Sequence, residues 1–399
     1  MNRLQQIVFA VLLFPCFLES IRDSFIPFSI GPLSLGRFTF ILAGILLIVG
    51  KRKLKMQRSN IFLGVLLILI ANLLASFLSG NTSDIARTSA NILLLIGARG
   101  CVDYYSTRIG SKAVNWFFIL SVIYWVVYFF RTIIIGGKLA VYSELFYEGN
   151  AINHHVIGML ISVSSIFVAI RYFFFDGRLK VVGYLIIISA SLICFITESR
   201  SNTIVTLMSI FILLFIERRV SIKLVSRLGF IVFILFYTFS FLTEQNDTLG
   251  QRFDISDMDY QERTTGVRFE MISLGIEEFF KNPLGKGFNN IEVLINGRTQ
   301  LVHNQYLSFI IGGGVLGFIG VIIWWNGIWK SLNSLRKTQN WEGLDRSFIT
   351  ACVVSMTIFQ ITLFTIEFSS LFLYQIIAIG IYAETKLREQ NNILNYISI

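Results

Sequence analysis

Residues 244–303 read EQNDTLGQRFDISDMDYQERTTGVRFEMISLGIEEFFKNPLGKGFNNIEVLINGRTQLVH, the one long polar stretch in a chain of apolar runs. The stretch contains ten acidic and six basic residues. A loop of more than about 15 residues without strong structure of its own is usually functional. We therefore expect this stretch to be a large loop between membrane-spanning helices and to provide half of an active site.

The composition is typical of a membrane protein. Of the 399 residues, 54% are hydrophobic and only 15% are charged, and the mean hydropathy is +0.69. Soluble proteins carry about 25% charged residues. The four cysteines include no CxxC pair, so the sequence predicts neither a disulfide framework nor a zinc site. The first apolar run, residues 6–18, resembles a signal-peptide core without a convincing cleavage site, and we expect it to be the first helix.

The pattern of apolar runs predicts an all-α polytopic membrane protein with about twelve transmembrane helices in a single transmembrane domain, residues 1–399. A helix needs about 20 apolar residues to cross the hydrocarbon core. Runs of suitable length lie near residues 4–19, 33–50, 61–79, 88–103, 114–131, 154–175, 180–197, 203–217, 228–243, 304–325, 348–366 and 370–385. The large loop, residues 244–303, then connects helices nine and ten.

Basic residues predict the orientation of these helices. One cluster, residues 51–58, follows the second helix, and another, residues 218–227, follows the eighth. Positive loops stay in the cytoplasm, and an N-terminus in the cytoplasm places both clusters there. The net charge of +10 is thus an orientation signal, and it does not indicate a nucleic-acid partner. The large loop is predicted to face outward.

Inside the large loop, residues 263–280 show helical periodicity with two adjoining apolar stripes. The first stripe is Val267, Met271 and Leu274, and the second is Phe269, Ile272, Ile276 and Phe280. Asn282 and Pro283 are expected to end the helix. Two interpretations fit: an amphipathic helix on the outer leaflet of the membrane, or a helix that packs a stripe on the membrane bundle. Both place Arg268 at the interface.

Arg200 lies in a short outward turn between two apolar helices, where a charge is costly and usually has a partner. Glu198 is the nearest candidate for an ion pair. Alternatively, the guanidinium binds a diphosphate through paired, planar hydrogen bonds. Arg268 is a candidate for the same anion site. Arg263, Arg298 and Arg252 are weaker ones, because ordinary salt bridges with the acids of the loop explain each of them better.

All three histidines are predicted to lie on the outer side. His303, beside Asn304, stands where the loop meets the next helix, and an imidazole there can accept a proton from a sugar hydroxyl. The alternative is a histidine that anchors the end of a helix. His154 and His155 begin helix six and are interpreted as structural or acceptor-side residues. The small residues of IGGGVLGFIG (311–320) predict close helix packing. No nucleotide-binding, protease or metal motif is present in a credible context, so no cofactor or metal is expected.

Four marks, in order along residues 195–320, resemble the bacterial O-antigen ligases and the related polysaccharide polymerases. They are Ser199-Arg200, Gly266-Val267-Arg268, the stretch NPLGKG (282–287), and His303-Asn304 followed after nine residues by Gly314-Val315-Leu316-Gly317. The N-terminal half matches only in topology. Each mark alone is weak, but four in this order are fairly specific to the superfamily.

The resemblance implies a metal-independent, inverting glycosyltransferase of GT-C-like architecture in the bacterial inner membrane, with its active site facing the periplasm. The implied donor is a glycan on undecaprenyl diphosphate. Arg200 and Arg268 would stabilise the departing diphosphate, and His303 would orient or deprotonate the acceptor hydroxyl. Asn304, Arg263, Arg298, Glu198 and His154 are the further candidates for binding the diphosphate or the glycan. Membrane lipid and a chain-length regulator protein are the other expected partners.

The branch of the superfamily stays open. Phe318 stands where ligases often have threonine, Ser201 stands where glycine is frequent, and the spacing from Arg298 to Gly314 resembles that of some polymerases. These departures favour a polymerase of O-antigen repeat units over a ligase that joins the glycan to lipid A-core. A flippase of lipid-linked oligosaccharide is the alternative outside the enzymes. Flippases tend to place charges at mid-membrane and to contain internal repeats, neither of which this sequence shows.

Overall fold

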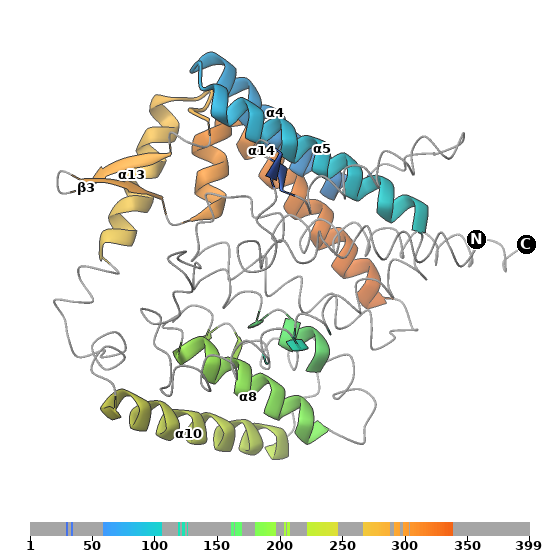
Figure 1. Ribbon diagram of the computed structural model, residues 1–399, viewed down its shortest axis with the longest axis vertical. Coiled ribbons are helices and arrows are strands. Elements are labelled where there is room, and N and C mark those ends of the chain that lie inside the picture. Colours follow the sequence, from blue (N-terminus) through green and yellow to red (C-terminus); the bar gives the residue numbers. More distant parts are fainter. Residues whose placement is uncertain are drawn as a thin grey trace, which may run out of the picture. The chain divides into compact units, whose positions relative to one another are not determined.

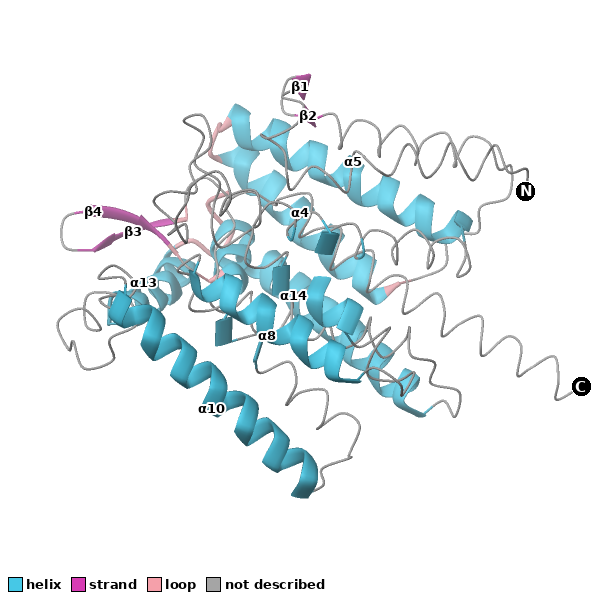
Figure 2. Ribbon diagram, turned by 60° about the horizontal axis from the view of Figure 1, so that its bottom comes forward, coloured by secondary structure: helices cyan, strands magenta, loops and turns pink. Residues whose placement is uncertain are grey.

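The structure is a computed structural model. It describes residues 29–30, 33–34, 59–105, 119, 122–123, 126, 161–162, 164–169, 180–196, 203–204, 206–207, 222–245, 266–287, 291–295, 298–302 and 304–337. These residues are mostly helical (Figures 1 and 2). Two of their helices, Asn60–Leu78 and Gln305–Lys330, are long and apolar enough to cross a membrane. The helices expected at 4–19, 348–366 and 370–385 lie outside the described residues, as do most of those expected at 33–50, 114–131, 154–175 and 203–217.

The chain divides into two compact units. The first contains β1 (Ser29–Ile30), β2 (Leu33–Ser34), α4 (Asn60–Leu78), α5 (Thr82–Tyr105), α13 (Val267–Lys281), β3 (Glu292–Ile295), β4 (Arg298–Leu301) and α14 (Gln305–Lys337). The second contains α8 (Lys180–Ile196) and α10 (Ile222–Gln245). The expected helices at 61–79, 180–197 and 228–243 are confirmed as helices within a few residues, except that α10 begins earlier.

α4 and α5 form a helical hairpin. Ser59 caps α4 by accepting a hydrogen bond from the Phe62 N–H at 3.1 Å. After a short turn, the side-chain oxygen of Asn81 accepts the Asp84 N–H at 3.3 Å and begins α5. α5 therefore starts at Thr82, six residues before the start expected from hydropathy, because its first turns are polar.

α14 is broken at Gly314, which has φ 60° and ψ −147°. Beyond the break the chain folds back, because the ring of Tyr306 lies 5.9 Å from that of Trp324 and 5.7 Å from that of Trp325. Figure 1 shows the two arms in orange. The expectation of one uninterrupted helix over 304–325 is therefore wrong. At about 1.5 Å per residue the short arm, 305–313, is about 14 Å long and the long arm, 315–337, about 34 Å. Only the long arm has the length to cross the hydrocarbon core.

Small residues bring the long arm of α14 against α4, as the sequence predicts. A Cβ on Gly320 would come within 2.8 Å of Ile68 Cγ1, and one on Gly327 within 2.8 Å of the Ile61 backbone nitrogen. At the break, a Cβ on Gly313 would meet Ala71 Cβ at 3.0 Å. The residue numbers rise on one helix as they fall on the other, so the two helices are antiparallel. The start of α4 and the basic end of α14 consequently lie at the same end of the pair.

The break in α14 is where the segment after α13 crosses it. The Lys286 N–H donates to the Ile311 carbonyl at 3.1 Å, the Gly287 N–H to Gly312 at 3.0 Å, and the Val315 N–H to Pro283 at 2.9 Å. An interrupted helix leaves carbonyl and N–H groups without helical partners, and these bonds satisfy three of them. We call residues 282–287 together with 311–315 the crossing.

Replacing Gly314 by alanine is expected to destabilise the protein strongly. A positive φ costs a non-glycine residue about 1–3 kcal/mol, and the added Cβ would in addition overlap the carbonyl oxygen of Pro283. Gly80→Ala is the matched control, because Gly80 also has a positive φ, 69°, but nothing lies within 4 Å of its Cβ position. Thermal unfolding in detergent should show a clearly larger loss for Gly314→Ala. Equal losses of stability in the two variants would mean that the crossing shifts to accommodate the added Cβ.

In the second unit, hydroxyl groups join neighbouring helical segments. Ser162 Oγ lies 2.5 Å from Thr206 Oγ1, and Ser191 Oγ donates to the Thr203 carbonyl at 3.3 Å. The rings of Phe195 and Phe239 stack at 4.1 Å between α8 and α10. Hydrogen bonds of this kind hold helices together in lipid, where the hydrophobic effect does not.

Candidate active site

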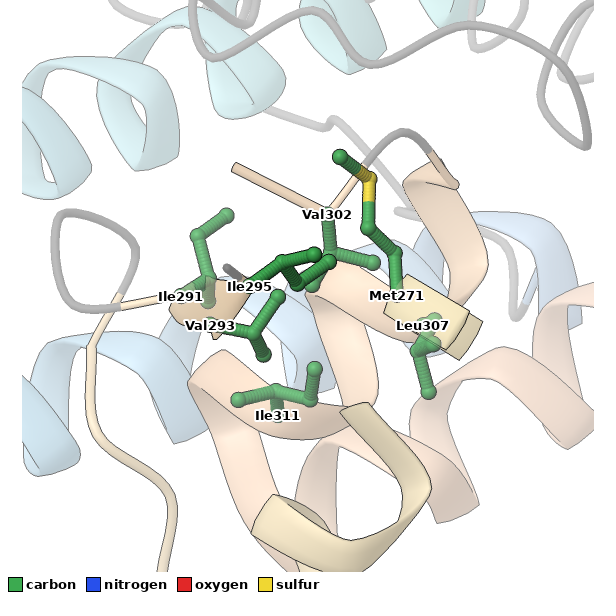
Figure 3. Close-up of a cluster of buried hydrophobic side chains, with 7 residues drawn as sticks. All are labelled: Met271, Ile291, Val293, Ile295, Val302, Leu307 and Ile311. Carbon is green, nitrogen blue, oxygen red and sulfur yellow. The ribbon is translucent and has the colours of Figure 1, made fainter. Parts of the chain in front are cut away.

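A small apolar core fixes how α13 lies against the short arm of α14. It consists of seven buried side chains that point toward one another in Figure 3: Met271, Ile291, Val293, Ile295, Val302, Leu307 and Ile311. Gly275 brings the helices together, since a Cβ there would be 2.7 Å from Leu307 Cδ2 and 3.1 Å from Ile311 Cδ1. The first apolar stripe of the sequence thus packs on protein.

The register of this contact places Arg268 near the start of α14. Along α13, Gly275 lies against Leu307 and Ile311, and Pro283 lies against Val315, so the two helices run in the same direction. The N-terminal ends of both helices are therefore at the same end of the pair, as Figure 1 shows. Arg268, the second residue of α13, is exposed at that end. Of the predicted site residues that the structure describes, Arg268 and Asn304 thus lie at the same end of this helix pair.

Asn304 begins the short arm as its N-cap. Its side-chain oxygen accepts the Leu307 N–H at 3.0 Å, and its carbonyl accepts the Ser308 hydroxyl at 2.7 Å. At least one atom of Asn304 thus has a structural role. Val302, on the other side of position 303, is fully buried in the apolar core. His303 itself lies outside the described residues, but both of its chain neighbours are held in place.

The β3–β4 hairpin carries Arg298 away from this point. β3 and β4 pair antiparallel with Glu292 opposite Leu301 and Ile295 opposite Arg298. Figure 2 shows the hairpin in magenta. The backbone of Arg298 is at the turn, about 10 Å along the strand from Leu301 at the usual rise per residue. Sequence reasoning did not predict this hairpin, although Asn296-Gly297 between β-branched residues is a strong signal for one.

The other predicted site residues, Arg200, Glu198, Arg263 and His154, lie outside the described residues. The helical segments on either side of Arg200 are described, and the bond from Ser191 Oγ to the Thr203 carbonyl joins them. The turn that contains Arg200 therefore connects two segments that are tied together.

Ion pairs attach the crossing to the end of α13. Lys286 Nζ is paired with Glu278 Oε2, and Asn282 Nδ2 donates to the same oxygen at 3.3 Å. Lys281 Nζ lies 2.8 Å from Glu277 Oε1, and a hydrogen bond with that carboxylate, aided by its charge and that of Glu278, raises the pKa of Lys281. These lysines stabilise the structure of the loop through ordinary salt bridges with its acids.

A buried polar cluster between α4 and α5 was missed by sequence reasoning. Its members are at most 1% exposed: Asn72, Ser76, Asp84, Thr88 and Asn91. The cluster touches the crossing, because a Cβ on Gly287 would lie 2.8 Å from Ser76 Oγ and 3.1 Å from Asp84 Oδ2. The spacing of four residues between Asn72 and Ser76, and between Asp84 and Thr88, was the available signal, because it places each pair on one face of its helix. Within the described residues, no group of three or more His, Cys, Asp or Glu side chains is arranged to hold a metal ion.

Residues 185–322 match the family model described as O-antigen ligase. The match contains the whole large loop, the crossing and the start of the long arm. It confirms, over this segment, the resemblance to the O-antigen ligase and polymerase superfamily. No curated protein matches the sequence. Together, the family and the apolar helices indicate an integral membrane protein with a role in polysaccharide synthesis.

Proposed function

We propose that the protein is a polymerase that joins lipid-linked oligosaccharide repeat units on the outer face of the bacterial inner membrane. The observation that supports the proposal is the shared direction of α13 and the short arm of α14. Arg268 and Asn304 are 36 residues apart in the chain, yet the helix ends that carry them lie at the same end of this pair. The family match supports a glycosyltransferase that acts on lipid-linked glycans.

The proposed reaction is a single displacement. The hydroxyl oxygen of the acceptor sugar attacks the anomeric carbon of the donor, and the bond from that carbon to the diphosphate oxygen breaks with inversion. The hydroxyl proton passes to the imidazole of His303. The lipid diphosphate leaves with its electron pair, and the guanidinium groups of Arg268 and Arg200 stabilise its negative charge. Each group acts on a charge that grows in the transition state.

The arrangement of α4 and α14 supports an outward-facing site. Basic residues precede α4 at 51–58 and end α14 at Lys330, Arg336 and Lys337, and positive ends stay in the cytoplasm. The crossing, at the other end, is then outside. The short arm returns from the crossing by about 14 Å at most, and we propose that the site beside it opens to the outer side.

The second candidate is an O-antigen ligase, which the description of the matching family favours. One experiment separates the candidates: purified protein in nanodiscs receives a defined undecaprenyl-diphosphate repeat unit, with or without lipid A-core. We expect longer lipid-linked glycans without the core. Transfer that occurs only onto the core would indicate the ligase. A protein that forms neither product, but moves the lipid-linked unit across a vesicle membrane, would contradict both enzymes and indicate a flippase.

A further inference from the structure

Three of the four residues of the second apolar stripe of α13 are not covered by the protein, while the fourth, Ile272, packs against the apolar core. Phe269, Ile276 and Phe280 are 70%, 47% and 74% exposed, whereas Met271 on the opposite side is 2% exposed. At about 100° per residue, the three exposed side chains fall within an arc of about 40°. They are three large apolar groups on one line along a helix whose other apolar face is already buried in the core.

Three exposed charged residues of α13 form a third sector beside this stripe. Glu270, Glu277 and Lys281 each follow one stripe residue in the chain, and all three are exposed. They consequently lie about 100° around the helix from the stripe. α13 thus has one side that packs on protein and one charged side suited to water. Its third side is apolar, yet neither protein nor a polar side chain covers it. A helix with this division is typical of a membrane interface.

The exposed stripe continues onto the helix that is long enough to cross the membrane. The ring of Phe279 lies 5.3 Å from that of Phe280 and 6.3 Å from that of Phe318 on the long arm. Leu284 is exposed next to Pro283, which accepts the Val315 N–H. From there the exposed apolar surface runs along the long arm through Val315, Phe318, Ile319 and Ile322. An exposed apolar surface that is continuous with a membrane-crossing helix is expected to contact the same lipid as that helix.

We propose that the stripe of Phe269, Ile276 and Phe280 is immersed in the acyl chains of the bilayer, which anchors the large loop in one leaflet. Under the proposed orientation this is the outer leaflet. The occupant is bulk lipid, because the stripe is exposed and joins the exposed apolar side of a helix long enough to cross the membrane. If the proposed function holds as well, the anchor keeps Arg268, next to Phe269, at the level where a lipid diphosphate lies.

The test is the solvent at each position of α13 in the full-length protein. Nitroxide labels are placed singly at residues 269, 276 and 280, and at the matched neighbours 270, 277 and 281, in a chain whose four cysteines are replaced by serine. In phospholipid nanodiscs, collisions with oxygen report hydrocarbon and collisions with a water-soluble nickel chelate report water. We expect oxygen to dominate at the three stripe positions and nickel at the three neighbours.

Two outcomes would overturn the proposal. Nickel access at the stripe positions would place them in water, and protection from both reagents would place them beneath protein, such as a second copy of this chain. A photo-crosslinking amino acid at 280, with 277 as its control, gives the same answer by lipid adducts in a chain that keeps its cysteines. Both readouts are independent of glycan transfer, so their failure is distinguishable from failure of the proposed function.

Discussion

Replacing His303 by alanine is expected to lower the rate of glycan transfer by about 10²–10⁴-fold, the usual contribution of a positioned acid or base. The change removes the group that receives the acceptor proton and leaves the leaving-group site intact. The measurement is the rate of chain extension by the purified variant on a defined lipid-linked repeat unit. The variant should be inserted and folded as before, because Val302 and Asn304 hold the chain on either side of this position.

His155→Ala is the matched control for this prediction. It removes another imidazole that is predicted to lie on the outer side, at a position that is not among the proposed catalytic residues. Extension should be nearly unchanged in this variant. If His303→Ala retains full activity, His303 is not the base, and its place at the start of α14 reflects only helix anchoring.

Local signals predicted the elements around the proposed site well. The helix of the large loop ends at Lys281, immediately before Asn282-Pro283, as the turn residues indicate. Its two stripes were visible as helical periodicity. Sequence alone left open whether these stripes meet protein or lipid, because both environments select the same apolar residues. The structure separates them: the stripe with Met271 packs on α14, and the stripe with Phe280 stays exposed except at Ile272, which packs against the core.

The sequence pattern could not predict contacts between segments that are far apart in the chain. The run Gly312-Gly313-Gly314 predicts close packing, and Gly313 does pack on α4. Nothing local shows that Gly314 breaks the helix, since that depends on the 282–287 segment arriving from another part of the chain. Hydropathy likewise failed to predict where α5 begins, because Asp84 and Thr88 in its first turns are polar yet buried.

Replacing Arg268 by alanine is the second change with a large expected effect, a loss of about 10²–10³-fold in kcat, as for removal of one donor to a developing oxyanion. The loss should fall on kcat more than on KM, because the diphosphate gains charge only as its bond to the sugar breaks. Arg268→Lys should recover only part of the rate, since an ammonium cannot make the paired, planar bonds of a guanidinium. Steady-state kinetics on a defined lipid-linked repeat unit provide the measurement.

Lys281→Ala is the control on the same helix. It removes another exposed positive charge of α13, but one paired with Glu277 at the end of the helix away from Asn304. If general attraction between the loop and the anionic lipid were the cause, both variants would lose activity alike, and added salt would weaken the wild-type protein by the same factor. If Arg268 acts on the leaving diphosphate, only Arg268→Ala should lose activity, and Lys281→Ala should keep it. A higher KM with unchanged kcat in Arg268→Ala would reduce its role to ground-state binding and remove it from the chemical step.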